Sequence, residues 1–321
     1  MVKKLFRLDI MIILLIILSV ISLFVGVSSL PIKDVFSLDE QQISVLIHSR
    51  IPRTVSIIIA GAALATCGLI MQQLTRNKFV SPTTAGTMEW AQLGILIGMI
   101  FFPSIGMLYK LGFAAMLALT GTLIFMQIIT RIQFKDIIFV PLIGLMLGSV
   151  VASIGTFLAL RTNNLQSIAS WMHGSFSTLV TGRYEVLYIS IPLFIIAIFY
   201  AHQFTVAGMG EDFSKNLGLN YKRVVNIGLF ITAAITAVVV VTVGMLPFLG
   251  LIVPNIVSIF KGDHLRSTIL ITAVLGAIFV MICDILGRII IYPYEVSVGL
   301  VIAVIGSLIF LVLIFRRVKH A

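Results

Sequence analysis

Two carboxylates, Glu89 and Asp284, lie well inside long apolar stretches of the 321-residue sequence. Ionisable groups in hydrocarbon are costly, so they mark ion pairs, solute pathways or proton relays. Arg288 follows Asp284 by one helical turn, and this spacing predicts an ion pair near the outer interface. Glu89 falls within two turns of the start of its predicted helix, where it can stabilise the positive helix end, meet cytoplasmic water or line a pathway. This set is too small for the relay of a proton-coupled pump.

Residue patterns for catalysis, metal binding or ATP binding are missing from the sequence. It contains no G-x-x-x-x-G-K-[ST] motif, and its polar segments hold no Ser/His/Asp or paired-carboxylate cluster. The histidines form no i,i+4 pair, and Cys67 and Cys283 stand alone within apolar segments. We therefore expect no catalytic residue, no metal site and no cofactor bound by this chain. Energy for any transport must come from a partner.

The elements that must position these residues are membrane helices. Hydrophobic residues make up 60% of the sequence and charged residues only 11%, which indicates lipid as the main solvent. Apolar segments fall near 8–29, 54–73, 84–102, 106–129, 137–160, 184–203, 224–246, 249–260, 267–290 and 297–315. The first is longer than the apolar region of a signal peptide, so we expect it to be retained. The predicted fold class is all-α integral membrane, one polytopic domain over 1–321 with about ten transmembrane helices.

Two segments interrupt this simple pattern. Segment 249–260 is too short to cross a bilayer, and it is accompanied by the helix-breaking residues Gly244, Pro247, Gly250 and Pro254. It predicts a short broken helix surrounded by protein or a water-filled cavity, because freed backbone groups cannot face lipid. The polar stretch 161–182 predicts a short outer helix capped by Gly174. Such features are typical of solute pathways, and a packing kink is the alternative.

The positive charges are unevenly distributed. Roughly two thirds of the 22 Lys and Arg residues fall on the side of both termini, so we predict a multi-pass protein of the cell membrane with cytoplasmic termini. We therefore attribute the net charge of +10 to Lys and Arg residues that set the orientation of the membrane helices. No basic stripe is interleaved with stacking aromatic residues, so nucleic acid is not an expected partner, whereas membrane lipid is.

One polar segment stands in the middle of the chain, AGMGEDFSKNLGLNYKRVVN over 207–226. It indicates two short cytoplasmic helices punctuated by glycines, which suits a surface that seats an ATPase subunit. In sequence it resembles the coupling segment of ABC importers for iron–siderophore complexes and vitamin B12. Four further stretches resemble that family's motifs in the same order: RIPRTVSIIIAGAALATCGLIMQQLTRNKFVSP, WMHGSF, PFLGLIVPNIVSIFKGDHLR and CDILGR. The likeness is strongest to Gram-positive permeases for petrobactin and other catecholate-type siderophores, through NKFVSPTTAGTMEWA and KRVVNIG.

The resemblance covers essentially the whole chain and implies a ten-helix permease that dimerises around a central pathway. The second permease subunit would be a copy of this chain or, more usually among such relatives, a different one. An extracytoplasmic substrate-binding lipoprotein would deliver the substrate, and two ATPase subunits would drive transport. ATP would then stay on the partner chains, and iron would travel inside its siderophore.

The matched motif positions imply three kinds of site. ATPase docking would use Gly210, Glu211, Leu217 and Gly218. Docking of the binding protein would use Arg50, Arg53 and Arg288. The gate and pathway would include Asn77, Phe79, Glu89, Ile137, Ile138, Trp171, Pro254 and Asn255.

The sequence departs from the family pattern at several positions. Lys78 stands where Pro is usual, Asn255 where His is usual and Ser258 where Arg is usual. Ile137 and Ile138 stand where a relative has small hydroxyl residues at an inner constriction. These departures leave the fold assignment intact and leave the gate and the chelator open.

Two other classes of function stay open. An ion-coupled secondary transporter would rely on Glu89 as its main ionisable group and would need no ATPase. A polytopic membrane enzyme would need catalytic clusters that the polar segments lack. Neighbouring genes for an ATPase and a lipoprotein would exclude both.

Overall fold

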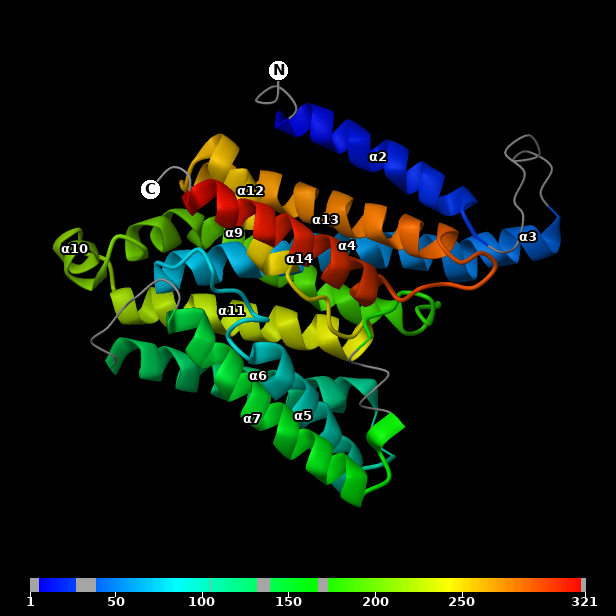
Figure 1. Ribbon diagram of the computed structural model, residues 1–321, viewed down its shortest axis with the longest axis horizontal. Coiled ribbons are helices and arrows are strands. Elements are labelled where there is room, and N and C mark those ends of the chain that lie inside the picture. The colour runs from blue at the N-terminus through cyan, green and yellow to red at the C-terminus, as the bar shows by residue number, and fades with distance from the viewer. Residues whose placement is uncertain (1–5, 27–38, 105, 132–138, 167–172, 319–321) are drawn as a thin grey trace.

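All regular elements that the structure describes are helices. The computed structural model describes residues 6–26, 39–104, 106–131, 139–166 and 173–318. In chain order the helices are α2 (Leu8–Phe24), α3 (Glu40–Val45), η2 (Leu46–Arg50), α4 (Ile51–Thr75), α5 (Thr87–Phe101), α6 (Met107–Arg131), α7 (Phe139–Arg161), η3 (Tyr184–Ile189), α9 (Ser190–Ala207), α10 (Glu211–Asn216), α11 (Tyr221–Thr242), α12 (Leu249–Lys261), α13 (Leu265–Ile289) and α14 (Val298–Val318). Figure 1 shows an elongated bundle with α3 and α10 at opposite ends of its long axis.

Each apolar segment predicted from the sequence overlaps a helix. Six helical stretches are long and apolar enough to cross a membrane: Glu40–Thr75, Leu108–Arg131, Phe139–Arg161, Tyr184–Ala207, Tyr221–Thr242 and Leu265–Ile289. Four apolar helices are shorter: Leu8–Phe24, Thr87–Phe101, Leu249–Lys261 and Val298–Leu313. An all-helical, multi-pass architecture is therefore confirmed, whereas the count of ten crossings stays a prediction.

The second predicted segment is longer than the apolar pattern indicated. α3, η2 and α4 form one continuous stretch from Glu40 to Thr75. Asp39 starts it with a capping box, in which its carboxylate accepts a hydrogen bond from Gln41 N. The π-helical turn η2 precedes Pro52, and the altered register accommodates the missing proline N–H. Polar residues thus extend this helix beyond its apolar part.

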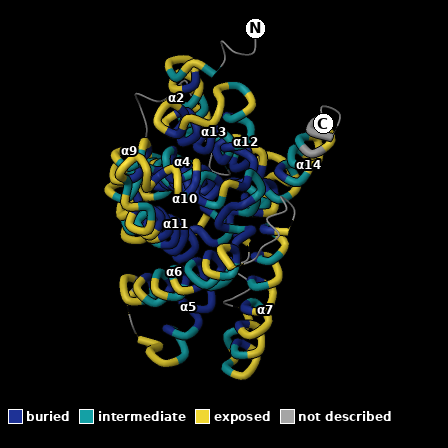
Figure 2. Tube along the Cα trace, turned by 90° about the vertical axis from the view of Figure 1, so that its left-hand side faces the viewer, coloured by how far each residue is buried: buried dark blue, intermediate teal, exposed yellow. Residues whose placement is uncertain are grey.

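Three helices form the centre of the bundle. Of the apolar windows, 78% is buried in Glu40–Thr75, 72% in Tyr221–Thr242 and 61% in Leu265–Ile289, but only 28% in Phe139–Arg161. Figure 2 shows the same contrast, with buried chain in the middle and α7 largely half-buried or exposed. α4 and α13 approach closely through glycines, since a Cβ on Gly61 would lie 2.8 Å from the carbonyl oxygen of Gly276. Small residues permit this contact between helices in lipid.

Two irregular segments lie inside the bundle, 76–86 between α4 and α5 and 243–248 between α11 and α12. The predicted break before segment 249–260 is therefore present, whereas the helix predicted from residue 84 begins only at Thr87. Segment 76–86 satisfies its own polar groups: the Ser81 N–H donates to Thr84 Oγ1 at 2.8 Å, and that hydroxyl donates to the Phe79 carbonyl at 3.0 Å. Internal bonding of this kind allows irregular backbone to be buried.

The helix predicted within the polar stretch 161–182 falls largely on residues 167–172, outside the described residues. Gly174 follows in irregular backbone, and its carbonyl accepts a hydrogen bond from Gly299 N at 2.9 Å. Gly174 therefore joins this stretch to the start of α14.

The closest approach of α4 to α12 gives a test of the packing. A Cβ on Gly68 would lie 1.8 Å from the Gly250 carbonyl oxygen, whereas one on Gly112 of α6 would meet nothing within 4 Å. We expect Gly68→Ala to destabilise the protein by about 1–3 kcal/mol, because helix backbones must separate. Gly112→Ala should instead be neutral or stabilise by up to about 1 kcal/mol, because alanine favours helix. Thermal unfolding of both purified variants in detergent measures the difference, and equal melting temperatures would contradict the close contact.

Candidate transport and docking sites

The polar segment between α9 and α11 is held in shape by glycines and one buried serine. Gly210 precedes α10 at φ 122°, and Gly218 follows it at φ 75°, both in the left-handed region that favours glycine. The buried Ser214 hydroxyl lies 3.0 Å from the Val206 carbonyl oxygen and 2.6 Å from that of Gly210, which ties α10 to the end of α9. Lys215 and Glu211 form an i,i+4 ion pair of 2.9 Å on the surface. The hydrogen bond from Lys215 lowers the pKa of the Glu211 carboxyl.

This segment exposes a row of apolar side chains. Met209, Phe213 and Leu217 are spaced by four residues and are 56%, 49% and 62% exposed. Such a row on a short projecting helix suits burial against a groove of another protein. Sequence reasoning identified Leu217 and missed Met209 and Phe213, although their spacing of four was a usable signal. The predicted ATPase-docking residues thus lie at the two ends of α10, with Gly210 and Glu211 at its start and Leu217 and Gly218 just after it, while their role stays a prediction.

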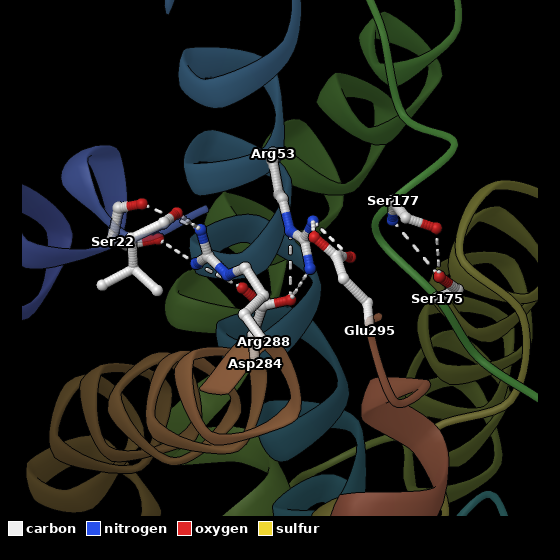
Figure 3. A network of polar contacts seen from close by, with 8 residues as sticks. Ser22, Arg53, Ser175, Ser177, Asp284, Arg288 and Glu295 are labelled. Carbon is white, nitrogen blue, oxygen red and sulfur yellow. Dashed lines mark hydrogen bonds and ion pairs between the residues drawn. The ribbon is translucent and has the colours of Figure 1, made fainter. Parts of the chain in front are cut away.

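Opposite α10, charged side chains tie four segments together (Figure 3). Arg53 of α4 pairs with Asp284 of α13 at 2.8 Å and with Glu295, beyond α13, also at 2.8 Å. The predicted pair of Asp284 with Arg288 is confirmed, and both of its side chains are almost fully buried. Arg288 also donates to the Ser22 and Val25 carbonyl oxygens at 2.9 and 2.7 Å, which anchors the end of α2.

The predicted docking arginines are thus heavily engaged within this chain. Arg50 and Arg288 are buried, and Arg50 donates to the Leu23 carbonyl. Arg53 is the most accessible, with 13% of its side chain exposed. Their docking role stays a prediction. The structure shows a second role, because these three arginines join α2, α4 and α13.

The predicted gate residues gather where segment 76–86 meets α12. Asn77 accepts a hydrogen bond from Phe79 N at 2.9 Å, and the Phe79 ring packs edge-on against Phe310 of α14 at 5.8 Å. The Asn255 amide donates to the carbonyl oxygens of Lys78 and Leu251, each at 2.7 Å. Ile137, Ile138 and Trp171 lie outside the described residues, so nothing tests their predicted positions.

Three departures from the family pattern prove to be neighbours. The Lys78 ammonium lies 3.0 Å from Ser258 Oγ and forms an ion pair with Asp263, to which Ser258 also donates. Asn255 holds the Lys78 carbonyl in the same place. These contacts connect the start of segment 76–86 with the end of α12 and the turn that follows it.

Pro254 interrupts the hydrogen bonding of α12. It lacks the N–H that would bond to the Gly250 carbonyl one turn earlier. The buried Gln72 amide of α4 approaches the carbonyl oxygens of Gly250 and Leu251 at 3.4 and 3.2 Å. The neighbouring helix therefore supplies polar contacts where the broken helix leaves backbone groups exposed.

Glu89 lies in the first turn of α5 and faces a small cavity. The cavity is about 110 Å³ and is lined by Glu89, Gln92, Leu93, Val151, Ala152, Gly155, Thr156 and Met245. Within the described part of the chain, no group hydrogen-bonds the buried Oε2 of Glu89. The cavity thus brings a carboxylate, an amide and a hydroxyl together between α5 and α7, while a role of Glu89 in a pathway stays a prediction.

Side chains that bind metals are not assembled in the described residues. No group of three or more His, Cys, Asp or Glu side chains there can hold an ion. Cys67 and Cys283 are both free and buried.

A multi-pass helical bundle with a proline-interrupted helix inside it and an exposed apolar segment at one end is an architecture that suits a membrane permease. The chain belongs to the FecCD transport family, whose sequence profile matches residues 14–316. It is therefore a permease component rather than an enzyme.

Named relatives cover nearly the whole chain. The chain is 59% identical over 309 residues to the petrobactin import system permease protein YclN of Bacillus subtilis (strain 168), covering 96% of this chain and 98% of that protein. It is 41% identical over 308 residues to the petrobactin import system permease protein FatD of Bacillus anthracis, covering 96% and 90%. The fold matches a solved metal-chelate type ABC transporter in an inward-facing conformation, with a TM-score of 0.82 at 23% identity, covering 96% and 98%.

Proposed function

We propose that this chain is the permease subunit of a binding-protein-dependent ABC importer that moves iron(III)–siderophore complexes into the cytoplasm. The similarity to two petrobactin permeases supports a petrobactin or other catecholate-type siderophore as substrate. The structural observation that carries the proposal is the exposed apolar row Met209, Phe213 and Leu217, because it gives separate ATPase subunits a surface to bind. ATP is hydrolysed on those partners, and iron enters as cargo inside its chelator.

We further propose ten membrane helices with both termini and α10 cytoplasmic, so that the arginine network faces outward. The short α12 then completes its crossing together with the irregular segment 243–248 that precedes it. The chain pairs in the membrane with a second permease subunit. A heterodimer is favoured over a homodimer because such relatives usually pair with a different chain.

The outward arginines dock the extracytoplasmic binding lipoprotein. Its acidic side chains approach Arg53 first, since Arg53 is the most accessible of the three. Arg50 and Arg288 are buried beneath this surface and assist docking by adding positive charge and by holding the end of α2 in place. The gate forms from Asn77, Phe79, Pro254 and Asn255, and Glu89 lines the pathway.

Uptake experiments test this function. Cells without this chain should lose import of radiolabelled iron supplied as a ferric catecholate, and expression of the chain should restore it. Loss of the ATPase or of the binding protein should have the same effect, because all three act in one complex. Ferric hydroxamate and ferric citrate serve as comparison substrates, whose uptake should be unchanged in the deletion strain if the chain is specific for catecholates. Normal uptake of every ferric chelate in the deletion strain would overturn the proposal.

Glu89 distinguishes the proposed importer from an ion-coupled carrier. If ATP hydrolysis drives transport, Glu89→Gln leaves uptake insensitive to an imposed pH gradient, as in the parent, because no proton needs to cross on this carboxylate. Proteoliposomes with a fixed internal ATP concentration and an added uncoupler provide the measurement. Collapse of parental uptake under the uncoupler at constant ATP would favour ion coupling instead.

A further inference from the structure

A second cavity, much larger than the one at Glu89, opens at the end of the molecule far from α10. Its volume is about 700 Å³, and its polar lining comes mainly from Lys110, His173, Ser175, Ser177, Thr178 and Arg183. The C-terminal end of α11 forms its wall, whereas α11 begins just after α10. The Thr181 N–H donates to the His48 carbonyl of η2 at 3.3 Å, which places this loop beside the α3–α4 end in Figure 1. In the proposed orientation the cavity is outward.

The charge of this cavity has one sign. Lys110 and Arg183 both line it, and none of the described residues that line it carries a carboxylate. In the part of the chain that the structure describes, neither cation has an ion-pair partner. The neighbouring Glu185 uses one carboxylate oxygen to accept a hydrogen bond from Gly182 N at 2.8 Å. Two cations therefore face an opening whose walls give them no counter-charge.

The other polar groups suit an oxygen-rich anion. The Ser175 and Ser177 hydroxyls lie 2.8 Å apart, and Ser177 N donates to Ser175 Oγ at 3.2 Å. The Gly299 N–H donates to the Gly174 carbonyl at 2.9 Å, which ties the loop of the two serines to the segment that follows Glu295 of the arginine network (Figure 3). Hydroxyl groups can donate to ligand oxygens while the cations supply the attraction.

The size of the cavity favours a small molecule as the occupant. Pockets that enclose ligands are roughly 300–1,000 Å³ and concave. Docking charges between proteins usually lie on the rim of a flatter surface. A ferric catecholate complex is a small molecule that suits such a basic cavity, because doubly deprotonated catecholates leave the complex with net negative charge.

We propose that this outer basic cavity is a receiving site for an anionic iron chelate, which Lys110 and Arg183 attract as it leaves the binding protein. The inference rests on the proposed function and adds the site and charge of the substrate. Charged walls in a concave site raise the local concentration of an oppositely charged ligand and speed its arrival. The attraction weakens as salt screens it.

Equilibrium dialysis tests the site directly. The purified complete transporter in detergent, without its binding protein, is dialysed against a ferric tris-catecholate chelate detected by its visible absorbance. The double variant Lys110→Gln with Arg183→Gln should weaken binding about ten-fold at low salt and lose most of the salt dependence. Arg161→Gln is the matched control, since Arg161 packs over the Phe157 ring and does not line the cavity. It should bind as the parent does.

Two further measurements separate the alternatives. The charge-retaining double variant Lys110→Arg with Arg183→Lys should bind the chelate about as tightly as the parent does. If it binds as weakly as the neutral double variant, positive charge at these positions is not what attracts the chelate, and the proposal is overturned. Association of the chelate-free binding protein should be unchanged in the neutral double variant. A parallel loss of that association would assign the cavity to protein docking instead.

Uptake in proteoliposomes keeps this inference distinct from the proposed function. If the parent takes up the chelate, and the neutral double variant binds and takes it up equally well, the receiving site is overturned and the proposed function stands. Absence of any uptake by the parent would sink the proposed function, and the dialysis result would still decide the site.

Discussion

Replacing Phe213 and Leu217 with aspartate is expected to abolish the ATP hydrolysis that substrate-loaded binding protein stimulates in the assembled transporter. Phe213 lies on α10 and Leu217 directly follows it, and both are about half exposed or more, so the chain itself does not need them for its core. Buried apolar anchors in an interface typically contribute about 2 kcal/mol or more each, and two new carboxylates add a desolvation penalty. Together these effects should weaken ATPase binding by at least about 100-fold.

The matched variant Phe213→Leu with Leu217→Met keeps the surface apolar and should hydrolyse ATP normally. Binding of the extracytoplasmic protein should persist in both variants, because its proposed surface is at the other end of the molecule. Stimulated hydrolysis that survives the aspartate variant would remove α10 from the docking surface.

Gly218→Val separates backbone shape from side-chain chemistry at the same place. A Cβ at Gly218 would meet nothing within 4 Å, yet its φ of 75° disfavours a β-branched residue. The variant should therefore reorient the chain after Leu217 and also abolish stimulated hydrolysis, without loss of the fold. Normal stimulated hydrolysis here would sink the role assigned to Gly218.

Removal of the Asp284 carboxylate is expected to give the largest loss of stability. Asp284→Ala leaves the buried Arg288 without its ion-pair partner and leaves Arg53 with Glu295 alone. Breaking a buried pair from one side typically costs about 3–5 kcal/mol, because an uncompensated charge stays behind. Thermal unfolding of purified protein in detergent measures this loss.

Two controls frame that measurement. Glu295→Gln should cost no more than about 1 kcal/mol, because Glu295 is partly exposed and solvent screens its pair. The double variant Asp284→Leu with Arg288→Met removes both charges of the buried pair and should recover part of the stability, while the hydrogen bonds of Arg288 to the end of α2 stay lost. If Asp284→Ala and Glu295→Gln unfold alike, the buried network is not the main support of this end of the bundle.

The sequence predicted the helices well because their apolar runs are long and the charges between them are strongly patterned. The apolar pattern could not locate the start of α4, since Glu40 to Arg50 are helical through capping and continuity rather than through hydrophobicity. It also extended α5 into segment 76–86, where buried Ser81 and Thr84 bond locally instead of forming a helix.

The candidate sites were predictable only where they are local. The i,i+4 spacing of Asp284 and Arg288 revealed their pair, but Arg53 is 231 residues from Asp284 and Ser22 is 266 residues from Arg288. Contacts at such separations follow from tertiary packing and leave no periodic signal in one sequence. The outer cavity was missed for the same reason, because Lys110 and Arg183 come from segments that only the fold brings together.

The contact of Lys78 with Ser258 and Asp263 also couples positions that lie far apart in the sequence. Replacing Lys78 with a neutral residue would remove one positive charge beside the Asp263 carboxylate, whereas a cation in place of Ser258 would add a second one there. Side chains that share a partner in this way have non-additive effects. The contribution of either position therefore depends on the residue at the other, and a substitution made at one of them alone does not measure what that position does by itself.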